Sequence, residues 1–259
     1  MIRYKPKTWE PFIFDEIFAV NEFDANKIIK HNIYEETIIT YENLFKYPHK
    51  VKDYFLNSPA ARWKHLPNGK NFVEYWDCRH NHLFPQVLEL YVIIDKIIHL
   101  TYSYSVLSTH YTPPYITNNI RSLTSNLFQW KNRPPLTNIP DCFGNHPHPD
   151  GTTDKYAMTM GLNDEEDIRK NGIGFYESVY GTHRLSSATK HLILTPDNVE
   201  NGRSYYQEDP EKYWKLPPKF IKHNFNKMII YPTYMFHGAY HDKLDFTEYP
   251  RITIASFLE

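Results

Sequence analysis

The stretch "FGNHPHPDGTTDKY", residues 143–156, is the part of the chain from which its fold and chemistry are best predicted. Its centre alternates two prolines with three side chains that can bind a metal ion, His146, His148 and Asp150. Proline fixes its own φ and disfavours the helical conformation in the residue before it, so both histidines are expected in extended backbone. Alternate side chains of an extended chain point to one side, so the three potential ligands share one face.

A further ligand from far along the chain would complete a metal site. Two imidazoles and one carboxylate on one face are the ligand set of many non-haem Fe(II) sites. His148 and Asp150 can both reach one ion, and the best third candidate is His237 in "YPTYMFHGAYH" (231–241). His237 follows a predicted strand that ends at Pro232 and a turn, and it is the start of the next predicted strand. If His146 and His148 both bound the metal together with His237, the site would instead be of the cupin His-x-His type.

An anion-binding pair is predicted on the last strand. In "RITIASF" (251–257), Arg251 and Thr253 share one strand face, and the isoleucines between them point the other way. A guanidinium pairs with a carboxylate through two hydrogen bonds, and a threonine hydroxyl can add another. Asn126, in "IRSLTSNLFQW" (120–130), is a further contact for the same ligand, or else an inward polar residue satisfied by the backbone.

The rest of the chain predicts helices followed by many short strands. Apolar residues at helical spacing predict helices over 47–57 and 83–102. After about residue 110, strand-like runs alternate with turn clusters, which is typical of a sandwich or barrel. We expect one domain over 1–259, with an α/β support region over 1–110 and a β core over 111–259. The strands predicted for the core are 120–130, 155–163, 173–178, 191–195, 226–232, 235–240 and 251–259.

The order of these parts resembles the Fe(II)/2-oxoglutarate-dependent oxygenases, which have His-x-Asp, a distal His, and an Arg on the final strand. Three segments look like strands of their prolyl-hydroxylase-like branch: "MTMGLN" (158–163), "NGIGFYES" (171–178) and "FNKMIIYPTYMFHGAY" (225–240). A fourth, "NFVEYWDCRH" (71–80), is similar to a segment of a little-characterised subgroup. The resemblance covers residues 115–259 well and the N-terminal part weakly.

The resemblance implies an α+β, mainly β fold, with a double-stranded β-helix (jelly roll) core and N-terminal helices packed against it. It implies Fe(II) held by His148, Asp150 and His237, and 2-oxoglutarate whose distal carboxylate meets Arg251 and Thr253. It also implies O2-dependent hydroxylation of an unactivated C–H bond, with release of succinate and CO2. The substrates of such enzymes include small metabolites, amino acids and peptidyl residues.

Two departures from that family pattern stand out. Gly161 occupies the place where many relatives have a tyrosine that contacts the cosubstrate, so another group must replace its hydroxyl or the pocket is looser. An insertion over 177–220, rich in Tyr, Lys and Arg, is a candidate lid or substrate wall. The carboxylate of Asp150 favours hydroxylation over halogenation, because halogenating relatives have a small residue there.

Other polar residues receive weaker predictions. His241 is expected at the surface, and His183 and His223 are interpreted as structural. Arg79 and Arg184 are candidate substrate contacts. Two alternative functions remain: a cupin-type metal-dependent hydrolase or isomerase, and a non-enzymatic jelly-roll binding module, for which these side chains would not cluster.

The composition is that of an ordinary globular protein, with 41% hydrophobic and 23% charged residues and a net charge of -1. A near-neutral charge gives no electrostatic reason to expect nucleic-acid or membrane partners. Two cysteines, Cys78 and Cys142, and an N-terminus without a signal-peptide pattern lead us to expect a cytoplasmic location. The expected partner is a small-molecule or peptidyl substrate, and the oligomeric state is left open.

Overall fold

The structure is a computed structural model that describes residues 17–57, 64–66, 73–79, 88–103, 120–130, 147–150, 155–164, 171–185, 199–200, 203–204, 210–241 and 251–258. Within these ranges strands predominate, accompanied by the helices α2 (Pro48–Asn57) and α3 (Leu88–Tyr102) and the short 3-10 helices η1 (Ala25–Lys27) and η5 (Pro210–Lys212). The strands are β1 (Ile28–Ile33), β2 (Glu36–Glu42), β3 (Lys64–Leu66), β4 (Val73–Arg79), β5 (Ile120–Trp130), β6 (Tyr156–Gly161), β7 (Asn171–Phe175), β8 (Val199–Glu200), β9 (Arg203–Ser204), β10 (Lys219–Lys222), β11 (Lys227–Pro232), β12 (His237–His241) and β13 (Arg251–Leu258).

The strands form a large sheet, a small sheet and a separate hairpin. The large sheet has eight strands in the order β1-β2-β11-β6-β13-β5-β4-β3, and the small sheet has three in the order β10-β7-β12. Every pairing between described strands is antiparallel. The prediction of a mainly β fold is therefore confirmed.

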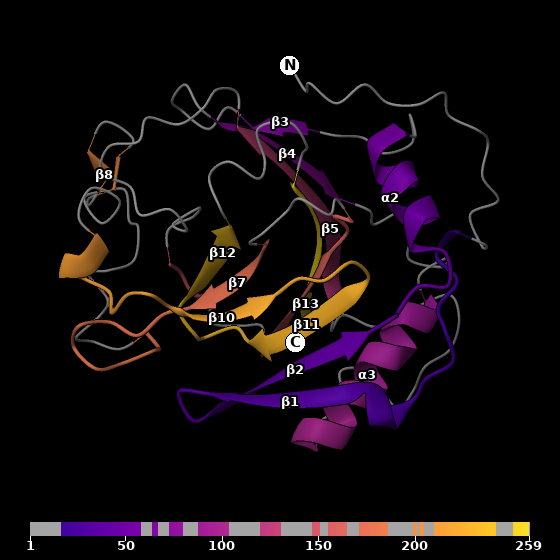
Figure 1. The fold of residues 1–259 in the computed structure, drawn as a ribbon, viewed down its shortest axis with the longest axis horizontal. Coiled ribbons are helices and arrows are strands. Elements are labelled where there is room, and N and C mark those ends of the chain that lie inside the picture. The colour runs from indigo at the N-terminus through magenta and orange to yellow at the C-terminus, as the bar shows by residue number, and fades with distance from the viewer. Residues whose placement is uncertain are drawn as a thin grey trace.

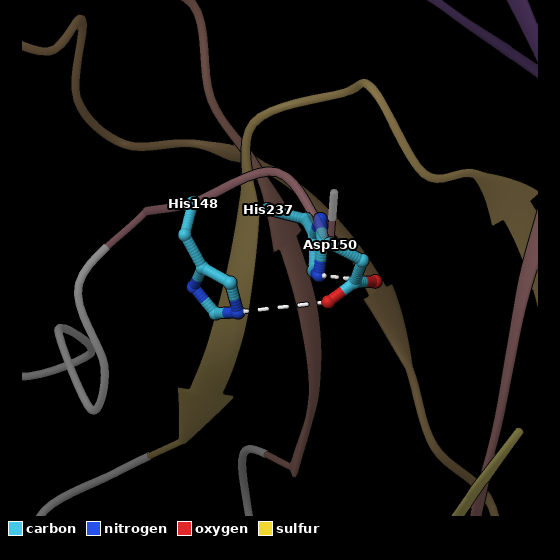
Figure 2. Close-up of side chains that lie close together, drawn as sticks. All are labelled: His148, Asp150 and His237. Carbon is cyan, nitrogen blue, oxygen red and sulfur yellow. Dashed lines mark ion pairs between the residues drawn. The ribbon is translucent and has the colours of Figure 1, made fainter. Parts of the chain in front are cut away.

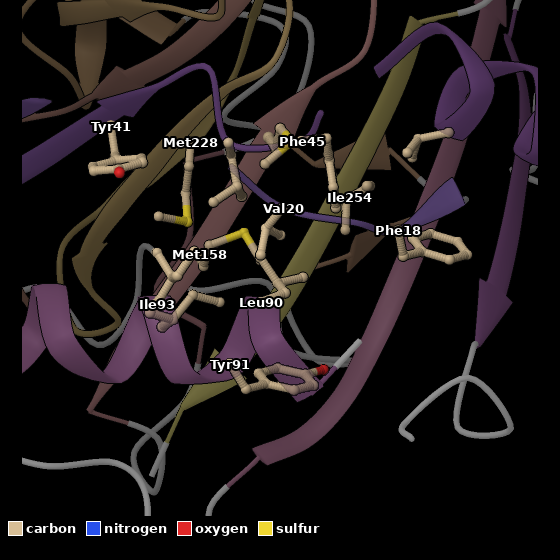
Figure 3. Packing of buried hydrophobic residues seen from close by; sticks show 14 of the residues in the cluster. Phe18, Val20, Tyr41, Phe45, Leu90, Tyr91, Ile93, Met158, Met228 and Ile254 are labelled. Atoms are coloured by element: carbon tan, nitrogen blue, oxygen red, sulfur yellow. The ribbon is translucent and has the colours of Figure 1, made fainter. Parts of the chain in front are cut away.

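The two helices cover one face of the large sheet (Figure 1). Because side chains alternate along a strand, Ile252 and Ile254 of β13 point to this face together with Met158 of β6. They form one buried cluster with Tyr91 and Ile94 of α3, both of which are 0% exposed. Figure 3 shows Ile254, Met158 and Tyr91 of this cluster. Burying each such side chain contributes roughly 1.5–3 kcal/mol, so this layer is a main source of stability.

The opposite face of the large sheet packs against the small sheet. Ala157, Ile229 and Tyr231 of the large sheet form a second buried cluster with Ile173 and Phe175 of β7. Figure 1 shows β7, β10 and β12 on the side of the large sheet away from the helices. Arg251 and Thr253 alternate with the helix-facing isoleucines, so they point into the space between the two sheets.

Most of the predicted elements are found where the structure describes the chain. The helix over 47–57 is confirmed, and α3 coincides with the end of the helix predicted over 83–102. The predicted strand 191–195 lies outside the described residues. All the other predicted core strands are found within a few residues of their expected bounds.

Strands β1, β2 and β10 are not among the strands predicted from the sequence. The hairpin of β1 and β2 joins the large sheet through β11, so the eight strands come from both the N-terminal third and the rest of the chain. Within the described ranges, neither helix combines the length and the apolar character needed to cross a membrane.

Candidate metal centre

The metal-ligand segment is attached to the chain around β12 by backbone hydrogen bonds. His148 and His237 form an isolated antiparallel bridge, in which the N–H of His148 donates to the carbonyl of His237 at 2.9 Å and the reverse bond is 3.1 Å. The N–H of Asp150 donates to the carbonyl of Thr233 at 2.9 Å. The proline-stiffened residues 147–150 are thereby fixed alongside the residues that carry the third predicted ligand.

Three side chains converge at this point (Figure 2). One ligand atom from each of His148, Asp150 and His237 lies within 4.8 Å of the other two. Nε2 of His237 is 3.1 Å from Oδ2 of Asp150, and Nε2 of His148 is 3.8 Å from Oδ1. Metal–ligand bonds of roughly 2.0–2.1 Å place neighbouring ligand atoms about 3 Å apart, so the cluster is close to the spacing that one ion requires.

Two further contacts orient the ligand atoms. Nδ1 of His237 is 2.9 Å from the carbonyl oxygen of Met235, which requires Nδ1 to carry the proton. Nε2 of His237 then faces Asp150. The hydroxyl of Tyr231 donates to Oδ2 of Asp150 at 3.2 Å. Such outer contacts hold metal ligands in place. Tyr231 lies in the segment 225–240 that resembles a family strand, but no role had been predicted for it.

Charges within the cluster support one another. Burial raises the pKa of the Asp150 carboxyl, but the neighbouring His237 and His148 outweigh it and leave that pKa below its usual value. Burial lowers the pKa of His237, but the Asp150 carboxylate outweighs it and leaves that pKa raised. The pKa of Tyr231 lies well above its usual value because of burial and the adjacent carboxylate, so its hydroxyl remains a donor. The Asp150 carboxylate is therefore favoured in its charged form at the point where the two imidazoles meet it.

Arg251 and Thr253 lie on β13 between the sheets, and Arg251 is only 8% exposed. Nε of Arg251 donates to Oδ1 of Asn171 at 2.8 Å, and Nη2 donates to the carbonyl of Gly172 at 3.2 Å. These contacts connect the large sheet to β7. No sequence pattern pointed to Asn171 itself, although it opens a segment that resembles a family strand.

The other predicted residues have mixed outcomes. Asn126 pairs with Thr253 in the sheet register, so it is next to the arginine strand, but its side chain is outside the described part of the structure. His146, the ligand of the cupin alternative, lies outside the described residues. The prediction that His241 lies at the surface is wrong. It is 1% exposed, because it shares a face of β12 with His237 and that face points inward.

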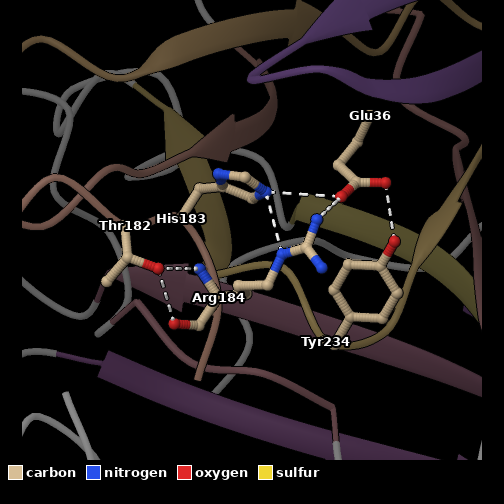
Figure 4. A network of polar contacts seen from close by, with 5 residues as sticks. All are labelled: Glu36, Thr182, His183, Arg184 and Tyr234. Carbon is tan, nitrogen blue, oxygen red and sulfur yellow. Dashed lines mark hydrogen bonds and ion pairs between the residues drawn. The ribbon is translucent and has the colours of Figure 1, made fainter. Parts of the chain in front are cut away.

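A network of hydrogen bonds and ion pairs around Glu36 holds the turn before His237 in place (Figure 4). The Glu36 carboxylate accepts a 2.6 Å hydrogen bond from the hydroxyl of Tyr234 and pairs with Arg184 and, at 3.4 Å, with His183. Arg184 also lies over the ring of Tyr234, 5.0 Å from its centroid. Arg184, a candidate substrate contact, is thus engaged in holding this turn.

Part of the insertion over 177–220 belongs to the core. Trp214, 1% exposed, packs against Tyr176 and Phe236, with ring centroids 6.0 and 4.9 Å away. Phe236 directly precedes His237, so this aromatic cluster packs at the residue before the start of β12. The described part of the insertion around Trp214 therefore belongs to the packed interior next to that strand.

Comparison with known proteins gives distant structural likenesses. No protein-family model and no curated protein matches the chain. Among solved structures, it is similar to an oxidoreductase of the 2OG-Fe(II) oxygenase family from Burkholderia pseudomallei, with 8% identity over 85% of this chain and 84% of that one and a TM-score of 0.44. It is also similar to a proposed oxygenase from Shewanella oneidensis, with 12% identity, coverage of 88% and 84%, and a TM-score of 0.46.

A third likeness is to the epimerase SnoN in complex with Fe3+, α-ketoglutarate and nogalamycin RO. Its identity is 10%, its coverage is 81% of this chain and 71% of that one, and its TM-score is 0.41. All three TM-scores are below 0.5, so these likenesses carry no conclusion about this chain.

Proposed function

We propose that this protein is an Fe(II)- and 2-oxoglutarate-dependent dioxygenase of the prolyl-hydroxylase-like branch that hydroxylates an unactivated C–H bond. The observation that carries the proposal is the convergence of His148, Asp150 and His237, whose ligand atoms all lie within 4.8 Å of one another. Two imidazoles and a carboxylate leave other positions of an Fe(II) ion open, as such chemistry requires. When bound, Fe(II), 2-oxoglutarate and O2 supply the oxidising chemistry, and the cosubstrate leaves as succinate and CO2.

The chain's own residues have separate tasks in this proposal. His148, Asp150 and His237 hold the ion, and Tyr231 keeps the Asp150 carboxylate in place. Arg251 and Thr253 take the distal carboxylate of 2-oxoglutarate. The protein thereby fixes the geometry of the cofactors, while the oxidation itself is cofactor chemistry.

The positions of the two groups support this assignment. Nη2 of Arg251 donates to the carbonyl of Gly172, and His237 pairs with Phe175, three residues further along β7. Three residues of a strand span about 10 Å, a distance of the order that a short dicarboxylate and its metal bond can bridge. A double-stranded β-helix predicts two sheets of antiparallel strands packed face to face, as the large and small sheets are, and we propose that fold for the core.

The clustering also bears on the alternatives. A binding module without a metal gives no reason for two imidazoles and a carboxylate to meet, whereas both metal-enzyme hypotheses do. The Asp150 carboxylate, with Oδ2 3.1 Å from Nε2 of His237, favours the set that contains Asp150 over the His-x-His set of the cupin alternative.

Anaerobic titration of the full chain with Fe(II) and then 2-oxoglutarate tests the proposal. We expect a weak visible charge-transfer band, and succinate release once O2 and a pool of candidate substrates are added. A His237→Ala variant should fold and lose both signals, and a variant of the exposed His99 on α3, His99→Ala, should keep them. No band and no succinate from the folded wild type would refute the proposal. Activity with Zn(II) or Mn(II) that does not depend on 2-oxoglutarate would favour the cupin alternative.

A further inference from the structure

His223 is a buried histidine that lies beside the predicted anion site. It follows β10 directly and is 3% exposed, and its N–H donates to the carbonyl of Asn171 at 2.7 Å. Its ring lies between two polar side chains. Nε2 is 3.1 Å from Oγ1 of Thr159, and Nδ1 is 3.5 Å from Nη2 of Arg251.

The absence of a side chain at Gly161 makes room for this ring. A Cβ at Gly161 would lie 2.7 Å from Cβ, 3.1 Å from Cγ and 3.4 Å from Nδ1 of His223. The first distance is shorter than real Cβ contacts allow. Gly161 is the position where the resembling family often has a cosubstrate-contacting tyrosine, so His223 fills the space beside the position of the missing side chain.

The chemistry of the neighbours fixes the state of the ring. A guanidinium has only donors, so Nδ1 of His223 must accept from Arg251. The proton of the neutral ring is then on Nε2, which donates to the Thr159 hydroxyl. Burial, followed by the charges of Arg251 and Lys227, lowers the pKa of His223 well below its usual value, in agreement with a neutral ring.

Three neutral groups accept hydrogen bonds from the Arg251 guanidinium. Oδ1 of Asn171, the carbonyl of Gly172 and Nδ1 of His223 accept from Nε and Nη2, and none of the three carries a charge. These contacts orient the fork.

We propose that His223 is a positioning residue: its Nδ1 holds the Arg251 guanidinium in the orientation that receives the distal carboxylate of a dicarboxylic oxo acid. The proposal rests on the function proposed above. It extends that function by giving a specific task to a histidine that the sequence pattern marks only as structural.

Two conservative variants separate positioning from mere packing. In His223→Asn, the amide oxygen can take the place of Nδ1, whereas in His223→Gln the amide reaches the place of Nε2. We expect calorimetric titration of the Mn(II)-loaded full chain with 2-oxoglutarate to give His223→Asn a Kd within about threefold of wild type. We expect His223→Gln and His223→Leu to weaken binding about ten- to a hundredfold, as lost hydrogen bonds to charged groups do. A purely structural role predicts that Asn and Gln weaken binding equally, and that result would overturn the proposal, as would equal binding by all variants.

A second measurement follows the rotation of the Arg251 guanidinium in the absence of 2-oxoglutarate. Nitrogen-15 NMR of the full chain should show slow rotation of the Arg251 guanidinium in the wild type and in His223→Asn, and averaged signals in His223→Gln and His223→Leu. Arg251→Lys assigns the signals, and His99→Gln is the control. The wild type could show slow rotation that is lost in His223→Gln and yet bind no 2-oxoglutarate. That result would refute the cosubstrate assignment and retain the positioning role. Rotation that is equal in all variants would refute the positioning role itself.

Discussion

Replacing Gly161 with alanine tests whether His223 is held as tightly as the structure shows. Gly161 lies in β6, between Lys227 of β11 and Thr253 of β13. Its φ is not in the left-handed region, so an alanine is compatible with its backbone. On backbone grounds alone, Gly161→Ala should stabilise the protein by about 0.4–1 kcal/mol, because it restricts the unfolded chain.

The contact with His223 reverses that expectation. The new Cβ would meet the Cβ of His223 at 2.7 Å, and this atom cannot move without the backbone. Overpacking of a well-packed interior costs typically about 1–3 kcal/mol. We therefore expect Gly161→Ala to lower the free energy of unfolding by about 1–2 kcal/mol once the backbone gain is subtracted.

The sign of the effect should depend on residue 223. In a His223→Ala background the offending Cβ is still present, so Gly161→Ala should remain destabilising. In a His223→Gly background all three close atoms are gone, and the same substitution should become stabilising by about 0.4–1 kcal/mol. The change of sign corresponds to a coupling energy of about 1–3 kcal/mol, which is within the range found for residues in direct contact.

Urea unfolding of the metal-free protein, followed by tryptophan fluorescence, measures these differences. The six proteins are wild type, Gly161→Ala, the two single variants of His223 and the two doubles. If Gly161→Ala had the same effect in the His223→Ala and His223→Gly backgrounds, the Cβ of residue 223 would not be the atom that requires a glycine at position 161. Stabilisation by Gly161→Ala in the wild-type background would refute the packing argument altogether.

Three further predictions concern charge and support. As the pH is lowered from 6.5, the unfolding free energy of the wild type should decrease relative to that of His223→Asn, by up to about 1.4 kcal/mol per pH unit. The reason is that His223 takes up a proton in the unfolded chain but not in the folded protein, where its pKa is lowered. Urea titrations at several pH values measure this difference. Tyr231→Phe removes the donor to Asp150 and should weaken Mn(II) binding about tenfold by calorimetry, with little change in fold by circular dichroism. Glu36→Ala should lower the unfolding free energy by about 1–2 kcal/mol, and Arg184→Ala, whose side chain is 51% exposed, by less than about 1 kcal/mol.

The orientation of the candidate side chains that alternate along one segment was predictable from sequence. Arg251 and Thr253 needed only the two-residue period of a strand, and His148 and Asp150 needed the same period with proline as the reason for extension. His237 required a longer inference, from a strand, a turn and a second strand. In each case the local pattern was enough because the strand itself determines which way the side chains point.

Contacts between sheets were not predictable in this way. His223 follows β10 and Asn171 is the first residue of β7, and neither position is marked by a local period. What brings them to Arg251 is the packing of the small sheet on the large one, which no single segment encodes. The error over His241 has the same origin. Its strand was predicted, but the burial of its face depends on which sheet covers it.

The two halves of the proposed site lie where the chain passes between the sheets. β11 leaves the large sheet at Pro232, a short turn follows, and β12 opens the small sheet at His237, with Asp150 bonded to Thr233 in that turn. At the other crossing, β10 ends in the small sheet and β11 begins in the large one, and His223 lies between them. A ligand bound to both the metal cluster and Arg251 would therefore connect the sheets at both crossings. Because it binds only where the sheets are packed, it should stabilise that packing in proportion to the logarithm of its concentration.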